Sequence, residues 1–228
     1  MDESTALVAA VRTGLAEAGD ARKAPEMQRY MKSELPYRGV AAPERRALTK
    51  RLFAEHVLES SSELRATVLT LWREAEFREE RYVAIELTGH RRYAQWQTPE
   101  LLPLYEEIIV TGAWWDYVDD VASRRIGPLL SAYRSTLTPV MHAWATDADL
   151  WKRRTSIICQ LTFRSATDTE LLTAAIEANI DDRDFFIRKG IGWALRQFAR
   201  TEPGWVRSFV DTHPGLSPLS VREAVKHL

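Results

Sequence analysis

The chain has 228 residues, 45% of them hydrophobic and 28% charged, and its formal net charge at pH 7 is −1. This length fits one large domain or a short repeat array with a substantial core. The near-neutral charge excludes a basic surface over the whole chain. Nine cations stand against six acids between positions 151 and 200, which leaves room for a local basic face.

The cysteine content and the first residues of the chain indicate the cellular compartment of the protein. The single cysteine, Cys159, excludes a disulfide framework. The opening Met1-Asp2-Glu3-Ser4 lacks the basic flank of a signal peptide, and no apolar run approaches the roughly 20 residues of a membrane span. We therefore expect a cytoplasmic protein that does not enter a membrane.

Apolar residues recur at three- and four-residue spacing along almost the whole chain, as in amphipathic helices. The predicted helices are Glu3–Ala18, Pro43–His56, Ser62–Glu74, Glu76–Gly89, Leu101–Thr111, Thr138–Ala145, Asp149–Leu161, Asp168–Ala178 and Asp184–Ala199. Signals such as Thr98-Pro99-Glu100 and Thr167-Asp168 mark helix starts. Connectors are short, and no composition break marks a second domain. The sequence predicts an all-α protein with one domain, residues 1–228.

Three of these segments begin alike. Glu76–Arg81, Asp149–Arg154 and Asp184–Lys189 each have an acid followed five places later by a cation. The equivalent position after Trp114-Trp115 is Asp119, and the successive spacings are 38, 35 and 35 residues. Such a period with two helices per unit predicts a HEAT-like solenoid, slightly shorter than the usual ~40–47 residues. Stacked units would form a curved superhelix, whose concave face would carry one column of equivalent positions: Arg81, Asp119, Arg154 and Lys189.

Two tryptophans flank this column. Trp115 precedes Asp119 by four residues, so both lie on one face of their helix, and Trp193 follows Lys189 by four. Core packing does not require a carboxylate between them, so the shared register favours a functional site.

Each residue taken alone also has a purely structural interpretation. Asp119 could be a surface acid that pairs with Arg153 or Arg154, and Arg154 could be a salt bridge between repeats. A tryptophan is more often core than ligand, and we assign Trp114, Trp151 and Trp205 to the core.

The segments around these residues resemble a known family. Thr111-Gly112-Ala113-Trp114-Trp115-Asp116-Tyr117-Val118-Asp119, the Arg154 segment and Phe185–Trp193 closely resemble the AlkD-type DNA alkylation repair glycosylases. Glu26–Lys32, with Pro43-Glu44-Arg45-Arg46 after it, looks like that family's opening helices, and Leu219–Ala224 looks like its closing segment. Val221 departs from the pattern, since a basic residue is expected there.

The resemblance implies a HEAT-like repeat array with a concave DNA-binding face. It implies excision of cationic alkylated purines, such as 3-methyladenine and 7-methylguanine, from duplex DNA during base excision repair. It places Trp115, Asp119 and Trp193 in the catalytic cleft, Arg154 at the backbone of the lesion and Tyr30 at a nearby DNA contact. We expect Lys189 and Arg196 to be further phosphate contacts.

The chemistry of such a substrate agrees with these residue types. A base that carries a fixed positive charge leaves neutral and needs no general acid, whereas the sugar gains positive charge that a carboxylate can stabilise. A hydrolase of this kind needs no cofactor, and no lysine replaces Asp119, so we expect a monofunctional glycosylase, although Lys189 leaves a bifunctional lyase open. The five histidines lack metal-ligand spacing, so no metal site is predicted.

Two other functions remain open. The chain could be a non-catalytic relative that binds distorted or branched DNA, although a pure phosphate binder gains nothing from an acid in its cleft. It could also be a protein-interaction scaffold, a common use of helical solenoids. With the glycosylase we expect a monomer that is associated with the nucleoid when it is on DNA.

Overall fold

The computed structural model describes residues 2–226 and 228, and within these residues it contains helices, turns and loops but no strand. The all-α prediction is therefore confirmed. The chain divides into two compact units, Met1–Gln97 and Thr98–Leu228. The prediction of one continuous domain stays a prediction, and each unit is described by itself.

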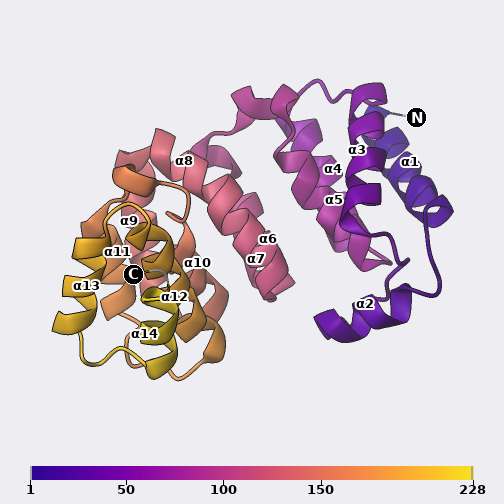
Figure 1. Ribbon diagram of the computed structural model, residues 1–228. Helices are drawn as coiled ribbons and strands as arrows, with labels where there is room; N and C mark the ends of the chain where they lie inside the picture. The colour runs from indigo at the N-terminus through magenta and orange to yellow at the C-terminus, as the bar shows by residue number, and fades with distance from the viewer. Residues whose placement is uncertain (1, 227) are drawn as a thin grey trace. The chain divides into compact units, whose positions relative to one another are not determined.

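The amino-terminal unit is a bundle of four longer helices with one short helix across one end of it (Figure 1). Its helices are α1 (Glu3–Glu17), α2 (Ala24–Met31), α3 (Ala42–Glu55), α4 (Ser61–Arg73) and α5 (Arg78–Thr88), followed by a 3-10 turn at Arg91–Trp96. Leu7 and Val11 of α1, and Leu64 and Val68 of α4, are fully buried or nearly so, because four-residue spacing places each pair on one helix face. Buried stripes of this kind hold α1, α4 and α5 together.

A buried carboxylate fixes the loop that leads into α3. Glu79 of α5 has no exposed surface, and its oxygens accept hydrogen bonds from the backbone N–H groups of Arg38, Gly39 and Val40 at 2.9–3.1 Å. Gly39 has a φ of 83°, a left-handed conformation that favours glycine. The loop is thereby tied to the start of α5.

The carboxy-terminal unit stacks its helices in successive pairs. They are α6 (Leu102–Gly112), α7 (Trp115–Val121), α8 (Gly127–Ala132), α9 (Arg134–Ala145), α10 (Leu150–Ile158), α11 (Thr169–Glu177), α12 (Phe185–Ala199), α13 (Pro203–Thr212) and α14 (Pro218–Ala224). Short 3-10 turns lie at Pro99–Leu101 and Arg164–Ala166. Contacts run from α7 to α10, from α10 to α12 and from α12 to α14 (Figure 1). We call this series the inner row.

The aligned acids of the repeat act as helix caps. Asp149 and Asp184 precede α10 and α12, and each side chain accepts hydrogen bonds from backbone N–H groups of the first turn. The cap sets where the helix begins, so the cation five places later falls at the same point of both helices. The first segment differs, because α5 begins at Arg78 after Phe77 and Glu76 is no cap.

The nine predicted helices are all present, with ends that differ by a few residues. One core cluster of the carboxy-terminal unit includes Ile158 of α10, Ile176 of α11, Ile191 of α12 and Phe209 of α13. Across the residues that the structure describes, no helix is both long and apolar enough to cross a lipid bilayer.

Candidate functional site

The helix that carries Asp119 begins at a sharp turn. Ala113 ends α6 in a left-handed conformation with φ 42°, and Trp114 is extended before α7 begins at Trp115. One helical turn later Asp119 lies on the same face as Trp115, as its spacing predicts. A π-helical stretch, Ala122–Ile126, then connects α7 to α8.

Asp119 and Arg154 form a two-pronged ion pair between α7 and α10. Arg154 Nε donates to Asp119 Oδ1 and Nη2 donates to Oδ2, both at 2.8 Å. This parallel geometry matches the planar guanidinium to the planar carboxylate. The ion pair between Asp119 and Arg154, given above as a purely structural interpretation of these residues, is therefore present. Their equal register in the repeat is what brings them into contact.

Arg154 is fixed on a third side by α12. It is 3% exposed, and its Nη1 donates to the backbone carbonyl of Phe186 in a close contact. Gly190 makes room for it, since a Cβ there would lie 3.0 Å from Nη1. In this conformation all three guanidinium nitrogens point to protein oxygens, and Arg154 joins three helices of the inner row.

Asp119 keeps a small opening to solvent. Its side chain is 15% exposed, against 4% for the side chain of Arg154. Burial raises the pKa of the Asp119 carboxyl, and the hydrogen bonds and charge of Arg154 act in the opposite direction. The carboxylate is thus held rigidly in a poorly solvated position with one edge accessible.

The tryptophans divide into two groups. Trp114 and Trp151 pack with Phe186 in an aromatic cluster, with ring centroids 5.1–6.5 Å apart. Trp115 and Trp193 are only half-buried, and neither has a ring partner among the described residues. Trp193 packs partly against the core cluster. The core assignment of Trp151 and Trp205 agrees with this division, since Trp205 stacks on Phe209.

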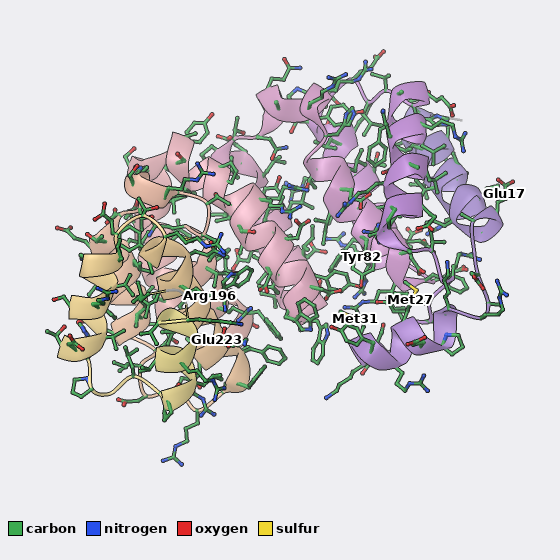
Figure 2. All side chains as sticks on the ribbon, viewed as in Figure 1. Glu17, Met27, Met31, Tyr82, Arg196 and Glu223 are labelled. Atoms are coloured by element: carbon green, nitrogen blue, oxygen red, sulfur yellow. The ribbon has the colours of Figure 1, made fainter. Side chains whose placement is uncertain are left out.

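Lys189 and Arg196 share one acid on the last helix. Lys189 Nζ lies 2.7 Å from Glu223 Oε1. Arg196 forms a close ion pair with Oε2 of the same carboxylate, and Figure 2 labels both of these residues. The hydrogen bond from Lys189, supported by the charge of Arg196, lowers the pKa of the Glu223 carboxyl. The Lys189 side chain is still 39% exposed, whereas that of Arg196 is 19% exposed.

Two further sequence candidates belong to the amino-terminal unit. Tyr30, on α2, is 75% exposed. Arg81, on α5, donates to the backbone carbonyl of Trp72 and lies over its indole ring, 4.7 Å from the centroid. In the described part of the chain, no group of three or more histidine, cysteine or acidic side chains could hold a metal ion.

Sequence analysis missed Glu223 and the Phe186 carbonyl. Glu223 lies in the closing segment Leu219–Ala224, which carried no assigned role. A carbonyl gives no signal in a sequence. The approach of Glu223 to α12 at Gly192, where an added Cβ would lie 2.6 Å from Glu223 Cβ, is seen only in the structure.

These features define an all-helical repeat protein with a partly accessible aspartate held by an arginine on its inner row. Residues 11–228 match the family model described as DNA alkylation repair enzyme. The chain belongs to this family, which assigns it a role in the repair of alkylated DNA. The resemblance noted in the sequence is thereby confirmed.

A solved structure supports the same membership. The protein described as "Predicted DNA alkylation repair enzyme from Enterococcus faecalis" is 32% identical to this chain, with a TM-score of 0.83 over 92% of this chain and 96% of that one. No curated protein sequence gives a significant match.

Proposed function

We propose that this protein is a monofunctional DNA glycosylase that hydrolyses the N-glycosidic bond of cationic alkylated purines in duplex DNA. The observation that carries the proposal is the Asp119 carboxylate, fixed by both prongs of Arg154 yet 15% exposed. Membership of a DNA alkylation repair family supports the substrate class. Substrates are 3-methyladenine, 7-methylguanine and bulkier N3 or N7 adducts.

The reaction needs no proton donor from the protein at the leaving base. As the bond between C1′ and the base nitrogen breaks, its electron pair neutralises the cationic purine, which departs without protonation. The sugar becomes oxocarbenium-like, as in glycoside hydrolysis. A fixed carboxylate stabilises this charge without reorganising, which is the largest contribution such a site can make. Water then forms the new C1′–O bond and loses a proton, which Asp119 accepts.

Arg154 acts as a positioning residue in this account. Each carboxylate oxygen has two lone pairs, so the two hydrogen bonds from Arg154 leave one lone pair on each oxygen for water or sugar. The guanidinium also favours the ionised form of Asp119. A direct contact between Arg154 and a phosphate would require the guanidinium to leave the Asp119 and Phe186 oxygens.

We propose that the half-buried indoles of Trp115 and Trp193 line the approach to the carboxylate. Trp115 lies one turn before Asp119 on α7, and Trp193 lies on α12 beyond Gly190. Their faces would attract the charged base and the developing charge of the sugar, at about 0.5–2 kcal/mol each. Because both rings are only partly buried, they keep surface that a substrate could contact.

The remaining candidates would bind the DNA backbone. Tyr30 and Lys189 are accessible, and phosphate contacts of this kind set the register of a protein on DNA. Arg196 would have to exchange Glu223 for a phosphate. We further propose that the protein acts as a monomer in the cytoplasm, associated with the nucleoid when on DNA, and requires no cofactor.

The test is single-turnover base release from a duplex that contains 7-methylguanine. Asp119→Asn should abolish release, because an amide cannot stabilise the sugar cation, while affinity for DNA stays equal or rises. Asp120→Asn is the matched control, since Asp120 is the next acid on α7 and pairs with Arg124 at the surface. It should release base at the wild-type rate.

Loss of Asp119 also leaves the Arg154 charge buried, which costs about 3–5 kcal/mol of stability. The double variant Asp119→Asn/Arg154→Gln removes both charges and should recover part of the melting temperature without recovering base release. Wild-type release rates in Asp119→Asn would refute the assignment. Duplex binding without any release by the wild-type protein would indicate the non-catalytic relative instead.

A further inference from the structure

An open cavity of about 460 Å³ lies within the amino-terminal unit. One side is formed by small residues at the end of α1 and the start of α2, including Ala21 and Ala24. Arg38, Phe77 and Gln28 also line the cavity. The volume lies within the range of small-molecule sites.

Arg38 is held rigidly at this cavity. Its backbone N–H donates to both oxygens of Glu79 at 3.1 Å, and its carbonyl accepts from Asp20 N at 2.8 Å. Its guanidinium lies flat over Phe77, with Cζ 3.7 Å from the ring centroid. Phe77 is fixed in turn, because its backbone N–H donates to Glu80 Oε1 at 3.2 Å.

The Arg38 guanidinium lacks an anionic partner. Its Nε is buried without a hydrogen bond, and no acid among the described residues forms an ion pair with it. The nearest acids are engaged elsewhere, since Glu79 accepts three backbone N–H groups and Asp20 pairs with Arg22 and Lys23. Arg38 is only partly buried, so an anion in the cavity could reach this unpaired guanidinium.

Gln28, which lines the same cavity, adds a second feature. It donates its Nε2 hydrogen to the carbonyl of Ser33 at 3.1 Å, which directs its amide and leaves Oε1 as an acceptor. An acceptor and a guanidinium in one cavity suit a ligand that combines an anion with a hydroxyl or amino group. Arginine matches phosphate oxygens with paired N–H donors.

We propose that this cavity binds a phosphate group, with Arg38 as the anion-binding residue and Gln28 as an acceptor for the rest of the ligand. The phosphate belongs either to a free phosphate monoester, such as a nucleoside monophosphate, or to a DNA strand. The site is independent of Asp119 and of the glycosylase assignment.

The test is calorimetric titration of the full-length protein with inorganic phosphate and, separately, with 5′-dAMP. The Nε–H resonance of Arg38 in NMR spectra reports the same site directly. Arg38→Gln should weaken binding of both probes by about tenfold or more, the value of one lost charge-assisted hydrogen bond. Ala21→Phe, which fills the cavity and leaves Arg38 in place, should do the same. Arg65→Gln, at an exposed position of α4, should not change binding.

The affinity of the protein for duplex DNA distinguishes the two sources of the phosphate, a free monoester and a DNA strand. If Arg38→Gln weakens duplex binding and reduces its salt slope by about one, the phosphate is that of DNA. If duplex binding is unchanged while 5′-dAMP binding is lost, the ligand is a free monoester. The proposal is overturned if the wild-type protein binds neither probe at millimolar concentration and Arg38→Gln leaves duplex binding unchanged. It is also overturned if a folded Arg38→Gln variant binds both probes as the wild type does. None of these measurements depends on base release.

Discussion

At the scale of single residues, the environment of Asp119 decides what it can do. A carboxylate in water is surrounded by mobile dipoles, whereas Asp119 is oriented by Arg154 before any substrate arrives. Burial raises its pKa and makes the charge costly, and the guanidinium offsets that cost. The result is a poorly solvated anion, which interacts strongly with a cation placed beside it.

The raised pKa predicts the pH dependence of base release. In the proposed mechanism only ionised Asp119 stabilises the sugar cation, so the rate should fall as the pH falls through the pKa of this group. The midpoint should lie above the ordinary aspartate value of about 3.9. Single-turnover rates across the acidic range, corrected for spontaneous depurination, check this. A rate that rises as the pH falls would instead indicate a protonated general acid.

At the scale of elements, α12 and α14 pack closely because Gly192 has no side chain. A Cβ there would lie 2.6 Å from Glu223 Cβ and 2.9 Å from the carbonyl oxygen of Ser220. Gly192→Ala should force the helices apart and lower the free energy of unfolding by about 1–3 kcal/mol. Gly204→Ala on α13 is the control, since nothing lies within 4 Å of its added Cβ. Denaturant unfolding of both variants measures the difference, and equal stabilities would contradict the packing argument.

Glu223 also links the same two helices by charge. Its lowered pKa means that its contribution to stability is present above the unfolded-state value of about 4.3 and is lost as the pH falls through the folded-state pKa. Glu223→Gln should therefore lower the free energy of unfolding by about 1–3 kcal/mol at pH 7. The difference from wild type should disappear in acid. A pH-independent difference would show that Glu223 acts by packing alone, and exposed Glu170→Gln should show none.

The helices were predictable from the sequence because their caps and periodicity are local. Asp149 and Asp184 fix the starts of α10 and α12, and their spacing predicted correctly that Arg154 and Lys189 occupy equivalent positions. The helices α8, α13 and α14 were not among the predicted ones, and each has a proline in its first two positions. Proline at the first helical position is nevertheless compatible with a helix.

The partners of the site could not be predicted in the same way. The spacing placed Asp119 and Arg154 at equivalent positions of the repeat. It did not show that two guanidinium nitrogens of Arg154 would donate hydrogen bonds to the Asp119 carboxylate. The pairing of Lys189 and Arg196 with Glu223 depends on how closely α12 and α14 approach, which is a tertiary property. Local rules give the register of each helix, whereas contacts between helices depend on packing.

At the scale of the whole molecule, the excess of cations between positions 151 and 200 leaves fewer unpaired positive charges for DNA than the sequence suggests. Of the nine cations between positions 151 and 200, five form ion pairs with acids: Lys152, Arg153, Arg154, Lys189 and Arg196. Binding to DNA would therefore require some of these pairs to exchange for phosphates. The net charge of −1 agrees with a protein that selects a damaged site rather than coating DNA.

In the proposed reaction the substrate supplies the positive charge, and Asp119 supplies only the matching negative one. This division of charge is tested by comparing base release from two duplexes of one sequence, one with cationic 7-methylguanine and one with neutral 8-oxoguanine at the same position. We expect release of 7-methylguanine by the wild-type protein, none by Asp119→Asn, and no release of 8-oxoguanine by either. Equal release of the neutral base would contradict it, because a neutral purine cannot leave without an acid that this site does not provide.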